Sequence, residues 1–216
     1  MTGLTGNLFF EGPAGRIEAI LKESDAPVER VAIVCHPHPQ YGGTMHNKVV
    51  FRIARAFHEA GFAVLRFNFR GVGLSEGTHD EGRGEEDDLC AAMKFVNQRF
   101  AGAKLWLAGF SFGSAVMLRV GCRDSGVTGL VAAGFPASKY EFPGLTGCDM
   151  PKLFVQGSLD QFGPVSELER FFSNLPEPKQ LVVVEGADHF FEGHLSDLAA
   201  TVTGFLESTP QNGLQN

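Results

Sequence analysis

The sequence has few basic residues and few cysteines, and it contains no long hydrophobic run. Its 18 Lys and Arg residues are outnumbered by 25 Asp and Glu residues, which gives a formal net charge of −7. Because nucleic-acid binding needs clustered Lys and Arg, this balance argues against a nucleic-acid partner. No stretch approaches the roughly 18 apolar residues of a membrane span, and residues 1–10 lack the pattern of a secretory signal. We therefore expect a cytoplasmic protein with no membrane partner.

The four cysteines are far apart, at Cys35, Cys90, Cys122 and Cys148. The absence of a C-x-x-C pair argues against a zinc site and against a dithiol redox site. An even number permits disulfides, but Cys35 ends an apolar run and is expected to be buried and reduced. We expect neither a metal nor an organic cofactor.

Length and composition are those of one globular domain. Hydrophobic residues make up 44% of the 216 residues and charged residues 20%. We expect a single domain over residues 1–207 and a polar tail over residues 208–216. The 20 Phe residues, against 2 Tyr and 1 Trp, are enough to fill part of the core and to line an apolar site. Nothing in the sequence separates a monomer from a homodimer.

Strand-like and helical segments alternate along the chain, which is typical of an α/β fold. Strands are expected at Arg16–Leu21, Val31–Cys35, Ala63–Phe69, Lys104–Ala108, Gly129–Ala133, Lys152–Val155 and Gln180–Val184. Helices are expected at Asn47–Ala60, Glu85–Phe100, Ser111–Cys122, Pro164–Leu175 and Gly193–Glu207. Several strands are uninterrupted apolar runs, so we predict a mostly parallel sheet flanked by helices on both faces. The acids that open the second helix suit its dipole better than a metal site.

The segment Gly109-Phe110-Ser111-Phe112-Gly113 has the G-x-S-x-G pattern. This pattern alone also occurs in ordinary glycine-serine turns. Here it follows an apolar strand and opens an apolar helix, which is the setting of a nucleophile on a sharp strand-to-helix turn. Glycines on either side let the neighbouring backbone approach without a Cβ clash. We predict that Ser111 is a nucleophile.

A serine nucleophile needs a base, and His189 is the best placed of the seven histidines. It lies just beyond the carboxyl end of the last strand. His58 and His194 fall on helical segments, and His46 and His79 lie in polar loop sequence where no strand aims them. Asp160 follows the preceding strand and is the predicted acid. Asp188 is the competitor, but its adjacency to His189 makes the required geometry unfavourable.

The order Ser111, Asp160, His189, each after a strand, resembles the α/β-hydrolase superfamily over nearly the whole chain. The stretches HPHPQYGGTM (residues 36–45) and FNFRGVG (residues 67–73) resemble small bacterial serine esterases. Many α/β-hydrolases carry Asp where this chain has Asn68, and Arg70 is expected to brace neighbouring loops. His36 and His38 are expected to stiffen their loop rather than to bind metal.

This resemblance implies an α/β-hydrolase fold and an oxyanion hole. Phe112 is expected to supply one N–H group, and the loop after residue 35 the other. Pro37 and Pro39 lack an N–H group, so the second donor is His38, Gln40, Tyr41 or a nearby glycine, and Tyr41 is preferred.

The connection over residues 134–151, where a cap is often inserted, is too short for a substantial cap. The site is therefore expected to be open, with walls that include Phe110, Phe135 and Phe162. The resemblance implies a carboxylesterase that hydrolyses small-molecule esters with short- to medium-chain acyl groups. A thioesterase, a small-peptide hydrolase and, less favoured, a non-catalytic binding protein of the same fold are the alternatives.

Overall fold

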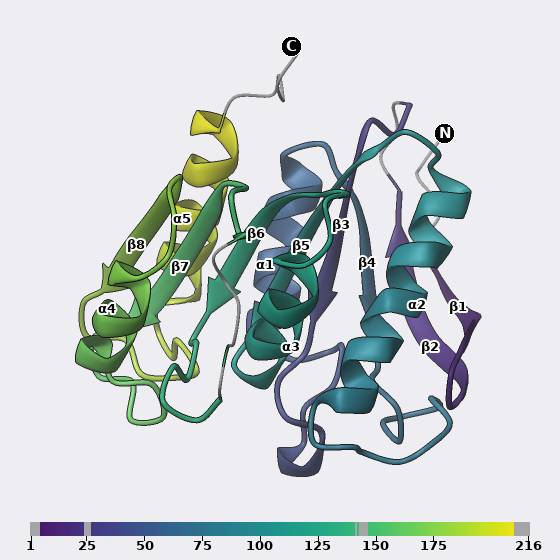
Figure 1. The fold of residues 1–216 in the computed structure, drawn as a ribbon, viewed down its shortest axis with the longest axis horizontal. Coiled ribbons are helices and arrows are strands. Elements are labelled where there is room, and N and C mark those ends of the chain that lie inside the picture. The colour runs from purple at the N-terminus through teal and green to yellow at the C-terminus, as the bar shows by residue number, and fades with distance from the viewer. Residues whose placement is uncertain (1–4, 24–26, 141, 143–146, 210–216) are drawn as a thin grey trace.

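An eight-stranded, mostly parallel β-sheet runs through the centre of the molecule (Figure 1). The structure is a computed structural model and describes residues 5–23, 27–140, 142 and 147–209. The strands are β1 (Thr5–Gly12), β2 (Gly15–Lys22), β3 (Arg30–Cys35), β4 (Ala63–Phe67), β5 (Lys104–Phe110), β6 (Val127–Ala133), β7 (Lys152–Gly157) and β8 (Lys179–Val184). Their spatial order is β1-β2-β4-β3-β5-β6-β7-β8. The pairs β1–β2 and β2–β4 are antiparallel, and all other pairs are parallel.

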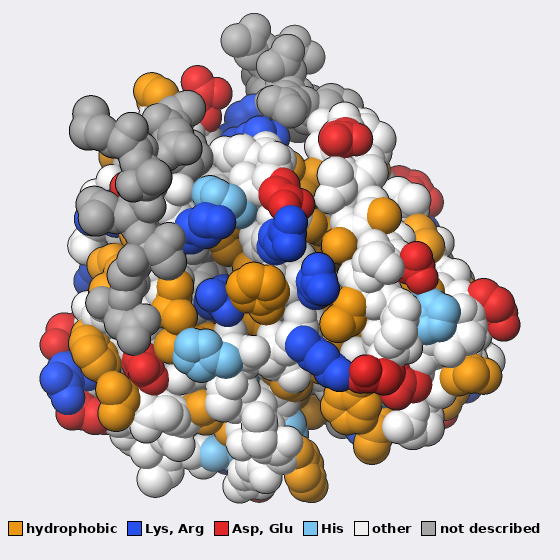
Figure 2. All heavy atoms as spheres, turned by 180° about the vertical axis from the view of Figure 1, so that it is seen from behind, with side chains coloured by type: hydrophobic (Ala, Val, Ile, Leu, Met, Phe, Trp, Pro, Cys, Tyr) orange, Lys and Arg blue, Asp and Glu red, His pale blue; other side chains and the backbone are white. Residues whose placement is uncertain are grey.

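Helices cover both faces of this sheet (Figure 1). Helices α1 (Lys48–Glu59) and α5 (Leu195–Ser208) pack together on one face, and α2 (Arg83–Arg99), α3 (Phe112–Gly121) and α4 (Val165–Ser173) lie on the other. Figure 2, which views the molecule from behind, shows Lys and Arg side chains gathered among hydrophobic ones on the α1 side. The predicted fold class is confirmed.

Strand β3 shows how the sheet separates two hydrophobic layers. Val31, Ile33 and Cys35 belong to the cluster beneath α2 and α3, whereas Ala32 and Val34 belong to the cluster beneath α1 and α5. Successive side chains of a strand point to opposite faces. Because both faces are covered, every position must be apolar, which is why this strand reads as an uninterrupted hydrophobic run.

All seven predicted strands and five predicted helices are present, with ends that differ by a few residues. Strand β1 was not predicted, because its eight residues include two glycines and a glutamate. This strand is held by antiparallel pairing with β2 and by Phe10, whose ring packs against Phe67 and Phe95. Helix α5 extends to Ser208, and residues 210–216 of the predicted tail lie outside the described residues.

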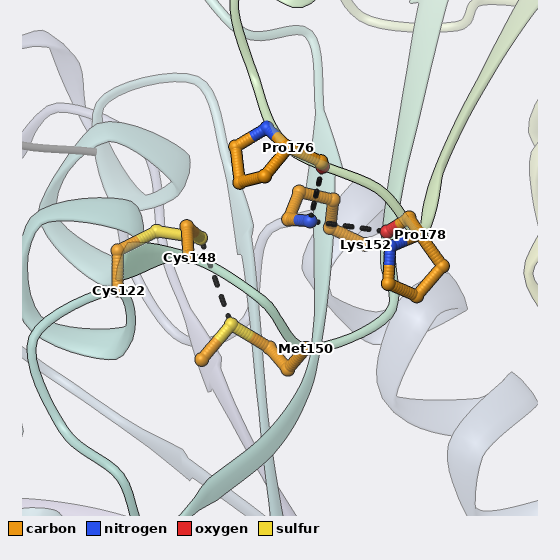
Figure 3. The surroundings of a disulfide bond; sticks show 6 residues. All are labelled: Cys122, Cys148, Met150, Lys152, Pro176 and Pro178. Atoms are coloured by element: carbon orange, nitrogen blue, oxygen red, sulfur yellow. Dashed lines mark hydrogen bonds between the residues drawn. A yellow bond between two sulfur atoms is a disulfide. The ribbon is translucent and has the colours of Figure 1, made fainter. Parts of the chain in front are cut away.

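Two of the four cysteines form a disulfide (Figure 3). Cys122, just after α3, is bonded to Cys148, which precedes β7. Nearby, the buried Lys152 donates hydrogen bonds to the carbonyl oxygens of Pro176 (2.9 Å) and Pro178 (3.0 Å). Burial lowers the pKa of Lys152. Cys35 is a buried free thiol, as predicted. Within the described ranges, no helix is both long and apolar enough to cross a membrane.

Candidate active site

Ser111 sits on the sharp turn between β5 and α3, with φ 54° and ψ −121°. Positive φ is uncommon for a residue with a side chain and here holds Ser111 at the start of the helix. A Cβ added at Gly109 would lie 2.4 Å from the carbonyl oxygen of Gly113, and one added at Gly113 would lie 2.4 Å from that of His36. The two glycines are therefore required by close backbone approach, as the G-x-S-x-G pattern predicts.

The structure brings Ser111, His189 and Asp160 into one hydrogen-bonded chain. His189 Nε2 lies 3.0 Å from Ser111 Oγ, and His189 Nδ1 lies 2.8 Å from Asp160 Oδ2. Because the carboxylate can only accept, Nδ1 carries the proton and Nε2 is free to accept the hydroxyl proton of Ser111. The three side chains come from the loops after β5, β7 and β8, at the carboxyl edge of the sheet.

The Asp160 carboxylate is almost fully buried and is held by three further N–H donors. Oδ1 accepts from the backbone N–H groups of Phe162 (2.8 Å) and Gly163 (2.9 Å), and Oδ2 accepts from Gln156 Nε2 (2.9 Å). Gln156 also accepts from the N–H of Phe135 and donates to the carbonyl of Gly163. Gln156 was not among the predicted site residues, although a lone amide near the end of the apolar strand β7 was the available signal.

Asp188, the competing acid, serves its own loop instead. Its Oδ1 accepts from the backbone N–H groups of Phe190 (3.0 Å) and Glu192 (2.9 Å). These bonds shape the turn that follows His189. The carboxylate of Asp188, next to His189 in the sequence, therefore supports the loop, whereas that of Asp160, distant in the sequence, contacts the imidazole.

The structure differs from the prediction for the second oxyanion donor. The N–H of Tyr41 donates to the carbonyl oxygen of His38 at 3.1 Å, within the 3-10 turn Pro39–Tyr41, and the Tyr41 side chain is 86% exposed. The N–H groups of Gln40, Gly42 and Gly43 are likewise bonded within the loop. In the described part of the chain, the His38 N–H donates to no acceptor. Phe112 is the first residue of α3, where the helix itself leaves the N–H free.

Two buried polar side chains tie the loop after β3 to the segment after β4. His36 Nδ1 lies 2.6 Å from the carbonyl oxygen of Pro37, and its Nε2 accepts from the N–H of Phe69 at 3.0 Å. Burial lowers the pKa of His36 to about 4, so the imidazole is neutral. Asn68 accepts from the N–H of Met45 (2.8 Å) and donates to the buried carboxylate of Glu18 (2.8 Å). An ionised Asp at position 68 could not donate to that carboxylate, so this contact requires the amide of Asn68.

The acids at the start of α2 act as loop supports. Asp88 receives hydrogen bonds from both the backbone and the guanidinium of Arg70, with the closest ion-pair distance at 2.8 Å. Arg70 therefore braces neighbouring segments, as the sequence analysis expected. This hydrogen bonding raises the pKa of Arg70. Glu85 caps the helix by accepting from the N–H of Gly82 at 2.8 Å.

Comparison with known proteins agrees with this architecture. Residues 32–204 match the family described as the alpha/beta hydrolase domain. The chain belongs to the alpha/beta hydrolase family. An alpha-beta serine hydrolase homologue from Coxiella burnetii is 37% identical, with a TM-score of 0.88 over 92% of this hydrolase and 96% of that chain.

Two further relatives of this hydrolase are similar over most of their length. A serine hydrolase without lid from Xanthomonas campestris is 35% identical, with a TM-score of 0.87 over 95% of this chain and 97% of that chain. An uncharacterized protein from Rickettsia prowazekii is 32% identical over 214 residues, which is 95% of this chain and 90% of that protein. These likenesses identify the fold as that of a lid-less serine hydrolase.

A cavity of about 650 Å³ opens above Ser111 in the hydrolase. It is lined by residues of the loops around His38, His189 and Pro136, together with Phe112, Phe162 and Phe190. Phe162 is 39% exposed, and its ring lies 4.9 Å from that of His189. The connection between β6 and β7 is only residues 134–151, which leaves no room for a cap domain.

The structure corrects two of the predicted cavity walls. Phe110 and Phe135 are fully buried and do not line the cavity. Phe110 ends β5 and packs beneath the imidazole of His189, with the two rings 5.0 Å apart. Phe135 packs in the core against Phe154 and Phe171. Both residues therefore support the site from within the core.

Proposed function

We propose that this protein is a serine carboxylesterase that hydrolyses small-molecule esters with short- to medium-chain acyl groups. The observation that carries the proposal is the hydrogen-bonded chain from Asp160 through His189 to Ser111, beneath an open cavity. In such a chain the base activates the hydroxyl and the acid orients the imidazole.

In the proposed mechanism, His189 Nε2 takes the Ser111 proton as Oγ attacks the acyl carbon. The carbonyl π electrons move to oxygen, and the N–H groups of Phe112 and His38 stabilise the resulting oxyanion. His189 then protonates the leaving alcohol as the ester C–O bond breaks, which leaves an acyl-enzyme. Water, deprotonated by His189, attacks the acyl-enzyme and releases the acid and free Ser111.

The cavity supports the proposed preference for modest acyl groups. It is open to solvent beside exposed aromatic side chains such as Phe162 and Phe190, and no cap encloses it within the described residues. An open site contacts only the first part of a long chain, so additional methylenes beyond the cavity add little binding energy. Neutral esters of short acids are therefore the expected substrates.

The test is turnover of p-nitrophenyl acetate, butyrate, octanoate and palmitate by the wild type and by Ser111→Ala. We expect kcat/KM to fall from the short to the long esters and kcat to drop by about 10⁶-fold in Ser111→Ala. A fluorophosphonate should label Ser111 in the wild type alone. Turnover that survives Ser111→Ala, or no turnover of any ester, would refute the proposal.

A further inference from the structure

His79 packs against the side chains of both residues that we assign to the oxyanion hole. Its ring centroid lies 4.9 Å from the ring of His38 and 5.7 Å from that of Phe112. The rings of His38 and Phe112 are themselves 4.9 Å apart. Three rings thus form a closed triangle at the edge of the cavity. Two of them belong to the residues whose N–H groups would meet the oxyanion.

A buried carboxylate fixes the orientation of His79. Its Nδ1 lies 2.8 Å from Glu85 Oε1, and the two side chains are 10% and 0% exposed. Glu85 also accepts from the N–H groups of Asp80 (3.1 Å) and Gly82 (2.8 Å). The carboxylate is therefore anchored to the first turn of α2 and to the loop that carries His79. The imidazole has little freedom to move.

We propose that His79, held by Glu85, is a positioning residue of the oxyanion hole. Its ring sets the separation of His38 and Phe112 and so keeps their N–H groups directed at one point above Ser111. This inference rests on the proposed serine-hydrolase function. Donors stabilise an oxyanion only when they lie about 2.7–3.1 Å from it. A displacement of about 1 Å costs on the order of 100-fold in rate.

The electrostatics of the triangle agree with a packing role. Burial, and then the neighbouring His79, lowers the pKa of His38. His38 is therefore neutral at neutral pH, and its ring can pack closely against the other two without charge repulsion. Its Nδ1 accepts from the N–H of Gln40 at 3.3 Å, which ties the side chain to its own loop.

The experiment compares the affinities of a short-chain trifluoromethyl ketone and of the corresponding trifluoromethyl alcohol. The ketone carbon forms a bond to Ser111 Oγ, the hydroxyl proton passes to His189, and the former carbonyl oxygen becomes an oxyanion. The alcohol fills the same cavity without forming that bond. The ratio of their dissociation constants therefore reports oxyanion stabilisation separately from cavity binding.

His79→Gln keeps a donor for Glu85 but removes the ring. We expect the ketone-to-alcohol affinity ratio to fall about ten-fold and kcat to fall with it, while KM and alcohol binding change less than about two-fold. His79→Phe restores a ring and should recover the ratio to within about two-fold of the wild type. His194→Gln is the matched control, because His194 pairs with Asp197 at 2.9 Å on the surface.

Glu85→Ala should lower the ratio in the wild type and leave it unchanged in a His79→Phe background, since Glu85 acts through the His79 imidazole. An unchanged ratio in His79→Gln would overturn the inference, even with a lower Tm. So would a His79→Phe ratio as low as that of His79→Gln. If the wild type binds ketone and alcohol equally, and Ser111→Ala leaves both affinities unchanged, the proposed function itself fails.

Discussion

Acidification should destabilise this protein through His36. In the folded state its pKa is lowered from 6.5 to about 4, chiefly because the imidazole is buried. In the unfolded chain His36 binds a proton near pH 6.5, whereas in the folded protein it binds one only near pH 4. Stability therefore falls as the pH drops through this window and is fully retained above it.

The magnitude follows from the two pKa values. Lowering a pKa from 6.5 to about 4 is worth about 3 kcal/mol when both states are fully protonated. Of this, about 2 kcal/mol is lost between pH 6.5 and about pH 4.5, before most carboxylates titrate. His36 is fully buried, so solvent screening does not reduce the effect.

The assay is urea unfolding of the wild type, His36→Gln and His46→Gln at several pH values across this range. His36→Gln removes the titrating group, so its free energy of unfolding should decline by about 2 kcal/mol less than that of the wild type. His46→Gln removes an exposed histidine and is the control. Parallel pH profiles for the wild type and His36→Gln, with equal m values, would refute the reasoning.

Three further changes test other parts of the structure. Asn68→Asp should lower the free energy of unfolding, measured with urea, by about 2 kcal/mol, because two buried carboxylates would meet. Adding Glu18→Gln should restore most of this loss. No recovery in the double variant would contradict the contact between Asn68 and Glu18. Replacing Cys122 and Cys148 by Ala should cost about 3 kcal/mol, since the disulfide closes a separation of 26 residues. An equal free energy of urea unfolding for this variant and the oxidised wild type would contradict this. Gly113→Ala should lose esterase turnover and lower the Tm, because its Cβ would meet a backbone carbonyl at 2.4 Å; full activity would show that the turn can relax.

Much of the fold and of the triad was predictable because the signals are local. A buried parallel strand such as β3 is recognisable from its five apolar residues, and Asn47, whose side chain accepts from the N–H groups of Val49 and Val50, marks the start of α1. The G-x-S-x-G segment contains both glycines that its turn requires. The carboxyl ends of parallel strands share one edge of the sheet, so the order of Ser111, Asp160 and His189 was enough to predict their meeting.

Contacts between distant segments required the tertiary structure. The loop after β3 offers several N–H groups. Only its folded turn shows that the N–H of Tyr41 is bonded, whereas that of His38 has no acceptor among the residues that the structure describes. Strand β1 depends on its partner β2 rather than on its own pattern.

The sequence also does not predict which way a side chain near the site points. Phe110 and Phe162 are the same residue type near the same site, yet the first lies beneath His189 and the second lines the cavity. The local pattern of His79 is that of a polar loop, and only the fold places its ring against those of His38 and Phe112. Local residue patterns determine where elements begin and end, because backbone preferences act over a few residues. The packing of loops from different strands decides which atoms come within bonding distance, because that depends on the whole sheet.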